Sequence, residues 1–277
     1  MSAHLDRLSL NQITIEQWSL PEFLEGCATA GVRYVGLWRH KVEDVGVTRA
    51  ARLVQECELR VSSLCRGGFF TERDFSHSEN RRALEEAAEL GSPVLVLVCG
   101  PPKSQDLGEA RARIAAGLEL LAPHAVELGV RLAIEPMHPM MIASRSAIVT
   151  LGEALTLARR FAPSEVGVVV DSYHVFWDPQ LSRHLASASR LIASLHVSDW
   201  VTPEDDILAS RVLPGDGIID FPKLISMVDS AGYDGPVEVE VINLKLRALP
   251  AQVLLEKVIE SYQRHIGAEV DQKTTST

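Results

Sequence analysis

The chain has 277 residues, of which 46% are hydrophobic, and a formal net charge of −10. This length suits one large domain, and no apolar run reaches the roughly 18 residues that a membrane-spanning helix needs. The acidic balance and the lack of a visible basic patch exclude an ordinary duplex-binding protein. They also disfavour a highly phosphorylated substrate, unless local arginines override the overall charge.

The N-terminus and the cysteines indicate the compartment. Residues 1–6 show no basic region followed by an apolar one, so no signal peptide is predicted. The cysteines lie far apart without a CxxC pair, which favours reduced and mostly buried thiols; they are Cys27, Cys57, Cys65 and Cys99. We therefore expect a cytoplasmic protein that does not associate with membranes.

Short β-branched apolar runs alternate with longer segments of helical spacing along the chain. This alternation predicts βα units and a parallel sheet. The eight expected strands are residues 8–13, 34–38, 61–64, 94–98, 132–135, 166–171, 192–197 and 237–241. The clearest expected helices are residues 79–90, 108–128 and 251–265. Pro123 should kink or break the second of these helices, because proline lacks the N–H that a helix interior uses.

Eight strands with seven or eight helices predict an α/β protein with a single-domain (β/α)₈ barrel, the TIM barrel. A doubly wound sheet is the main alternative. It usually begins with a Gly-rich turn, and neither a GxGxxG nor a P-loop pattern occurs here. We expect the barrel to occupy residues 1–266 and residues 267–277 to form a polar, disordered tail.

Four ionisable residues stand at the ends of the last four expected strands: Glu135, Asp171, His196 and Glu240. Strand ends of a barrel converge on one mouth, and neighbouring strands lie about 4.8 Å apart. A buried charge there is costly unless it is paired or binds a metal. Two Glu, one Asp and one His suit Mn²⁺, with Mg²⁺, Co²⁺ and Zn²⁺ as alternatives. Four unrelated polar strand ends are the other interpretation.

Five segments carry a family resemblance: residues 132–136, 171–174, 195–199, 214–217 and 232–240. Together they resemble the sugar isomerase and epimerase superfamily with the xylose-isomerase-like barrel, over nearly the whole chain. The resemblance implies that Glu135, Asp171, His196 and Glu240 hold Mn²⁺ or a similar ion. It also implies that His174 touches the substrate.

Two segments carry a narrower resemblance. Residues 135–140 and 173–179 are similar to the catalytic α subunits of bacterial C-glycoside deglycosidases. Such enzymes split 3-keto C-glycosides and work with a small β subunit. Typical epimerases have Asn or another residue where His138 stands. The narrower resemblance therefore implies a lyase with a partner subunit.

The expected reaction is proton abstraction next to a carbonyl. A metal polarises the carbonyl while a base removes the α proton, and the candidate bases are Glu135, Glu240 and His138. Return of the proton gives an epimerase or isomerase, whereas loss of a group from the β-carbon gives a lyase. We expect a keto-sugar or 3-keto-glycoside as substrate and favour the C-glycoside lyase, with a sugar or cyclitol isomerase as the alternative.

Several residues around the expected ligands suit substrate binding. Residues 66–70 follow the third expected strand, where a Gly pair allows a ligand to approach the backbone. Arg211 suits either substrate hydroxyls or an ion pair with Glu240, and Glu238 should be paired one layer deeper in the barrel. The residues expected to contact substrate are His174, Arg66, Trp38, Trp177, Phe69 and Arg211. Packing or surface roles are the alternative for each of them.

Two other function classes compete with this prediction. Some DNA-repair AP endonucleases share the barrel, but they need extra His and Asp ligands and a basic DNA-binding face. A non-catalytic barrel scaffold has no need of four ligand-type residues, and metal analysis of the purified protein distinguishes it. We expect a small-molecule substrate, a small β subunit if the narrower resemblance holds, and no nucleic acid.

Overall fold

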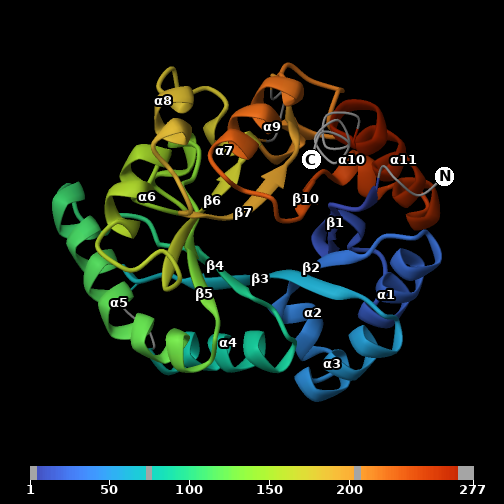
Figure 1. Cartoon of the computed structure of the whole chain (residues 1–277), viewed down its shortest axis with the longest axis horizontal. Helices are drawn as coiled ribbons and strands as arrows, with labels where there is room; N and C mark the ends of the chain where they lie inside the picture. The colour runs from blue at the N-terminus through green and yellow to red at the C-terminus, as the bar shows by residue number, and fades with distance from the viewer. Residues whose placement is uncertain (1–4, 73–76, 203–206, 268–277) are drawn as a thin grey trace.

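The strands of the barrel lie at the centre of the molecule, with helices around them (Figure 1). The computed structural model describes residues 5–72, 77–202 and 207–267. Eight parallel strands close into a barrel in the order β1-β10-β7-β6-β5-β4-β3-β2. They are β1 Leu8–Asn11, β2 Tyr34–Trp38, β3 Arg60–Gly68, β4 Val94–Val98, β5 Arg131–Ile134, β6 Val166–Asp171, β7 Ile192–Val197 and β10 Val237–Val239. The predicted (β/α)₈ barrel is confirmed.

Helices cover the outside of the barrel, and short helical turns follow several strands. The helices are α1 Leu20–Thr29, α2 Arg39–Glu43, α3 Val47–Glu56, α4 His77–Glu89, α5 Leu107–Glu127, α6 Leu151–Ala158, α7 Ser172–Val175, α8 Leu181–Ala186, α9 Phe221–Ser230, α10 Leu244–Arg247 and α11 Ala251–Tyr262. The shorter turns are η2 Gln12–Ile15, η3 Pro139–Met141, η4 Ile207–Ser210 and η5 Gln263–Gly267. In the described parts of the chain, no helix is both long and apolar enough to cross a membrane.

The apolar strands pack on both of their faces. Every residue of β4, with the sequence VLVLV, is buried, as expected for a strand that lies between helices and the barrel interior. Pairing of β1 with β10, in the register Leu8↔Val237 and Leu10↔Val239, closes the barrel. One buried cluster of strand residues is apolar and includes Val96, Ala133 and Val169. All four cysteines are free thiols, and three of them are buried.

Gly36 leaves room for a buried carboxylate inside the barrel. A Cβ at this position would lie 1.9 Å from Oε1 of Glu238. We expect Gly36→Ala to lower the free energy of unfolding by about 1–3 kcal/mol, because overpacking forces neighbouring groups to move. Urea unfolding measures this change. An unchanged midpoint would show that Glu238 can move aside without cost.

The third strand is longer than the sequence predicts, because residues 66–68, which were expected to follow it, belong to it. β3 continues to Gly68 and pairs with β4 through Gly67↔Leu97 and Gly68↔Val98. A Cβ on Gly68 would lie 2.2 Å from the carbonyl oxygen of Val98, so this pairing requires glycine there. The Gly pair therefore marks close contact between two strands.

The sequence predicts that Pro123 kinks or breaks its helix, and the structure contradicts the break. The helix α5 runs without interruption from Leu107 to Glu127. Pro123 and Glu119 are both exposed, so the Glu119 carbonyl that loses its N–H donor faces water. At the end of the chain, Gly267 is buried in η5, which contradicts its place in a disordered tail. Residues 268–277 of the predicted tail lie outside the described residues.

Candidate metal centre and active site

The four strand-end residues converge at the carboxyl end of the barrel. Glu135 and Glu240 directly follow β5 and β10, Asp171 ends β6, and His196 lies in β7. All four side chains are buried, and one ligand-type atom from each lies within 4.8 Å of the others. Nδ1 of His196 is 3.8 Å from Oε1 of Glu135 and 3.9 Å from Oε2 of Glu240. The structure thus brings together the four residues that the strand-end pattern selected.

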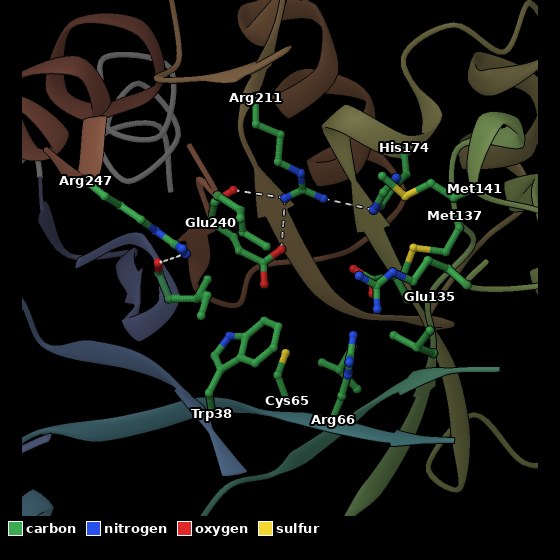
Figure 2. Close-up of a pocket in the computed structure, with 15 residues that line it drawn as sticks. Trp38, Cys65, Arg66, Glu135, Met137, Met141, His174, Arg211, Glu240 and Arg247 are labelled. Carbon is green, nitrogen blue, oxygen red and sulfur yellow. Dashed lines mark hydrogen bonds and ion pairs between the residues drawn. The ribbon is translucent and has the colours of Figure 1, made fainter. Parts of the chain in front are cut away.

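Arg211 neutralises part of the negative charge in this cluster. It lies in β9 (Arg211–Val212), which pairs with β8 (Asp199–Trp200) after β7. Its guanidinium donates to Oε2 of Glu240 at 3.0 Å and to Oδ2 of Asp171 at 3.0 Å. It also lies 2.9 Å from Nε2 of His174 (Figure 2). Of the alternatives that the sequence left open for Arg211, the structure shows the ion pair with Glu240, and this pair is buried.

A second carboxylate layer lies beneath the first. Oε1 of Glu238 accepts from Nδ2 of Asn11 at 2.5 Å, and Oε2 accepts from the hydroxyl of Ser62 at 2.7 Å. Asn11 also approaches Oε1 of Glu240 at 3.3 Å. Glu238 is therefore paired inside the barrel, as the sequence predicts. Asn11 connects this layer to the cluster above.

The titration of the cluster reflects burial and crowded charges. Burial raises the pKa of Glu135 to about 8, and the charges of Glu240 and Asp171 add to this effect. Burial would also raise the pKa of Asp171, but Arg211, His174 and His196 together with the backbone N–H of Tyr173 outweigh it and lower that pKa. Burial would lower the pKa of His196, but neighbouring carboxylates outweigh it and raise that pKa.

The cluster fits a divalent metal ion. Both ring nitrogens of His196 are buried without a hydrogen-bond partner, and a buried polar atom is normally satisfied. Three carboxylates converge on the same space, where crowding raises the pKa of Glu135. A divalent cation would satisfy the imidazole and neutralise the carboxylates together. The donor set of oxygens and one imidazole nitrogen suits Mn²⁺, Mg²⁺, Co²⁺ or Zn²⁺.

We expect the metal-free protein to lose stability as the pH rises through about 8. The raised pKa of Glu135 means that the folded state favours the protonated carboxyl. The contribution of this carboxyl to the free energy of unfolding is therefore complete below its ordinary pKa of 4.5. That contribution disappears as the folded protein is forced to ionise Glu135. Urea unfolding between pH 5 and 9 with a chelator present measures the slope.

Two controls identify the group responsible. Glu135→Gln should reduce the slope, because the amide does not titrate. Saturation with Mn²⁺ should reduce it as well, because metal binding requires the ionised carboxylate. An identical slope in Glu135→Gln would assign the effect to other groups.

A cavity of about 230 Å³ opens over Glu135 and Glu240 (Figure 2). Trp38 and Arg66, from β2 and the end of β3, line one side of it. Apolar side chains line another part; they include Val96, Val98, Met137 and Met141. Glu135 and Glu240 therefore belong to the cluster and also line an open cavity that suits a small molecule.

His174 lines this cavity, but protein groups contact both of its ring nitrogens. The backbone N–H of His138 donates to Nδ1 at 3.0 Å, and Arg211 lies against Nε2. Burial lowers the pKa of His174 to about 3, so the ring is neutral. Asp171 opposes this shift, with its Oδ2 3.8 Å from Nε2.

Three residues predicted to act at the site do not line the cavity. His138 caps η3, where its Nδ1 accepts from the backbone N–H of Met140 at 3.2 Å. Trp177 packs edge-on against His138 and donates its indole N–H to the carbonyl of His174 at 2.7 Å. Phe69 lies beside Arg66. His138 and Trp177 therefore support His174 from outside the cavity.

Three polar residues of the site escape the sequence analysis. Asn11 ends β1, but the expected strand ran on to residue 13, so the strand-end rule would not have selected it. Arg145 and Arg247 line the cavity from a loop and from the end of α10. No motif surrounds these two arginines, so only the folded chain places them at the site.

Asp199 explains one of the segments that carry the family resemblance. Its carboxylate accepts backbone N–H groups from Gly215, Gly217 and Ile219, each at 2.9 Å. These bonds hold the turn after β9, the strand that carries Arg211. Asp199 therefore contributes to the site by fixing the turn next to the strand that carries Arg211.

The barrel and its cluster define a protein class. The chain belongs to the Xylose isomerase-like TIM barrel family, whose model matches residues 24–264. A solved protein from Sinorhizobium meliloti 1021 is 38% identical, with a TM-score of 0.90 over 94% of this chain and 98% of that one. The IOLI protein with a binding zinc atom is 22% identical, with a TM-score of 0.82 over 96% of this chain and 98% of that one, and supports the fold alone.

Curated relatives include a lyase and an isomerase. A 3-dehydroshikimate dehydratase of Pseudomonas aeruginosa is 29% identical over 253 residues, which cover 84% of this chain and 38% of the dehydratase. The chain thus spans well under half of that relative. An inosose isomerase of Halalkalibacterium halodurans is 24% identical over 95% of this chain and 99% of its own length. Both of these relatives are enzymes, which agrees with the class predicted for this chain.

Proposed function

We propose that this chain is a divalent-metal-dependent enzyme that removes the proton α to the carbonyl of a small polyhydroxylated ketone. The observation that carries the proposal is the convergence of Glu135, Asp171, His196 and Glu240 within 4.8 Å beneath a cavity. The dehydratase and the isomerase among the relatives support a keto-sugar or keto-cyclitol as substrate.

The four clustered residues would hold the ion, for which we favour Mn²⁺ over Mg²⁺, Co²⁺ and Zn²⁺. When bound, the ion supplies Lewis acidity that polarises the substrate carbonyl and makes the α proton more acidic. Arg211 keeps Asp171 and Glu240 oriented through its hydrogen bonds to both carboxylates. The apolar side chains of the cavity exclude water from the reacting carbon.

We propose Glu135 and Glu240 as the groups that move the proton. They reach the cavity from β5 and β10, which β6 and β7 separate in the barrel. One glutamate takes the α proton, and return from the other inverts the carbon. Return to the neighbouring carbon isomerises the substrate, and a leaving group on the β-carbon departs with the electron pair to give a lyase reaction.

The position of His138 makes it a weaker candidate for the base. Its ring caps η3 and does not line the cavity. His138→Ala should therefore lower turnover less than tenfold, whereas Glu135→Gln should lower it at least a hundredfold. Steady-state kinetics of the two metal-loaded variants compare the roles. Complete loss of turnover in His138→Ala with metal retained would return the role of base to the histidine.

The cavity favours a substrate with a single ring. Its volume of about 230 Å³ is below the roughly 300–1,000 Å³ of pockets that hold drug-sized ligands. A C-glycoside lyase with a small β subunit is the second candidate. Trp38 lines the cavity beside Arg66, and its ring suits an aromatic aglycone.

Product analysis tests the proposal and separates the two candidates. The metal-loaded protein is incubated with keto-sugars, keto-cyclitols and 3-keto glycosides, with and without any small β subunit that copurifies with it. We expect metal-dependent formation of an isomer or an elimination product from a single-ring ketone. Aglycone release that requires the β subunit would favour the C-glycoside lyase. Turnover that survives complete metal removal would contradict the proposal.

A further inference from the structure

Four arginines line the cavity, and they differ in whether a protein group pairs with the guanidinium. Arg211 contacts two carboxylates of the metal cluster, and Arg247 pairs with Glu16 and donates to the carbonyl of Ile13. Arg66 and Arg145 also line the cavity. Among the described residues, neither of these two guanidiniums forms a hydrogen bond or an ion pair. The cavity therefore contains two cationic groups without a protein counter-charge in contact.

Aromatic rings fix the position of Arg66. Its guanidinium carbon lies 5.6 Å from the ring centre of Trp38 and 5.0 Å from that of Phe69. Cation–π contacts of this kind hold the group in place without using its N–H donors. In Figure 2, Arg66 extends from β3 toward the space between Trp38 and Glu135. Its donors are thus available to a ligand.

Arg66 and Arg145 lie close enough to affect each other. Burial lowers the pKa of Arg66, and the charge of Arg145 lowers it further. Both side chains are half-buried, so water screens their repulsion only in part. An anion placed between the two guanidiniums would remove this repulsion and use their planar N–H donors.

We propose that Arg66 and Arg145 bind a carboxylate carried by the substrate, so that the enzyme acts on a keto acid of single-ring size. This inference rests on the proposed function for its reacting carbonyl, which lies at the metal cluster. The carboxylate lies at the Arg66 side of the same cavity. A phosphoryl group has the same recognition chemistry, but its second negative charge faces more repulsion from Glu135 and Glu240.

The inference assigns a specificity that the net charge of −10 does not suggest. Glu135 and Glu240 offset part of the charge of Arg66 from a distance. A neutral sugar would leave Arg66 and Arg145 without a carboxylate in contact, whereas a carboxylate pairs with both. The expected consequence is selection between otherwise similar ketones by charge. Loss of an arginine should then weaken binding of the acid and leave binding of the neutral ketone nearly unchanged.

Matched ligands test this selection directly. One series is D-fructuronate, D-fructose and D-fructose 6-phosphate, and a second is 3-dehydroshikimate and its methyl ester. Calorimetry measures each dissociation constant with and without Mn²⁺. We expect the acid of at least one series to bind at least tenfold tighter than its neutral partner. Tighter binding of the neutral partner in both series would overturn the inference, and a preference for the phosphate would overturn the carboxylate assignment.

Arginine variants show whether the selection comes from this pair. Arg66→Gln and Arg145→Gln should each reduce the acid preference to less than threefold, and Arg145→Gln leaves the aromatic contacts of Arg66 in place. Arg49→Gln, an exposed position on α3, removes the same charge away from the cavity and should keep the preference. A preference that survives in both cavity variants would overturn the inference.

Two separate measurements distinguish anion binding by Arg66 and Arg145 from the proposed proton abstraction. Deuterium uptake from D₂O into the bound ketone reports proton abstraction, whereas calorimetry reports anion binding. An arginine-dependent acid preference without deuterium uptake would support the anion site and contradict the proposed reaction. Deuterium uptake without an acid preference would support the reaction and contradict the anion site.

Discussion

Asp171→Asn is expected to remove metal binding and to lower turnover by about a thousandfold or more. The amide has nearly the same shape, but it keeps only one of two hydrogen bonds, because Arg211 donates to Oδ2 and the backbone N–H of Tyr173 donates to Oδ1. It lacks the negative charge that a divalent ion needs from its ligands. Elemental analysis of the purified protein and steady-state kinetics with added Mn²⁺ measure the two losses.

A nearby carboxylate provides the matched control for this variant. Asp216 is exposed in the turn after β9, and Asp216→Asn makes the same chemical change away from the cluster. It should retain full metal content and turnover. An Asp171→Asn protein with normal metal content and normal activity would contradict the assignment of the cluster as the metal site.

Arg211→Met is expected to destabilise the metal-free protein by about 3–5 kcal/mol, because it leaves two buried carboxylates without their partner. The guanidinium is buried, and its donors contact Asp171 and Glu240 at 3.0 Å. Added Mn²⁺ should recover part of the loss, since the ion would neutralise the same carboxylates. Urea unfolding with chelator and with saturating Mn²⁺ measures the difference.

An exposed ion pair shows what loss of an arginine costs elsewhere. Arg113 pairs with Glu109 on the surface of α5, one helical turn away. Arg113→Met should change the free energy of unfolding by about 0.5 kcal/mol or less, with no response to metal. Equal losses in the two variants would mean that Arg211 does not neutralise the cluster.

The sequence was sufficient for the barrel because strand and helix patterns alternate clearly. Continuous apolar runs with β-branched residues reproduce the observed bounds of β2, β4, β6 and β7. The end of β3 was missed because glycine is common both in loops and where two backbones approach closely. The partner of Gly68 is Val98, about thirty residues further on, and no local pattern reveals that contact.

The candidate cluster was predictable for the same reason as the strands. Glu135, Asp171 and Glu240 each end or follow a buried strand, and parallel strand ends converge in a barrel. His138 shows the limit of sequence proximity. It stands three residues after Glu135, but the chain turns into η3 and the ring caps that turn outside the cavity. Arg145 shows the reverse case. No motif in the sequence marks it, and only folding places its loop at the cavity.

Transfer of solvent deuterium tests the central claim most directly. The Mn²⁺-loaded protein is incubated in D₂O with single-ring keto-sugars, keto-cyclitols and keto acids, and mass spectrometry and NMR locate any deuterium. We expect deuterium at the carbon next to the carbonyl of at least one ketone, dependent on Mn²⁺ and absent in Asp171→Asn. Turnover of a ketone without deuterium at that carbon, or equal uptake in Asp171→Asn, would contradict metal-dependent α-proton abstraction.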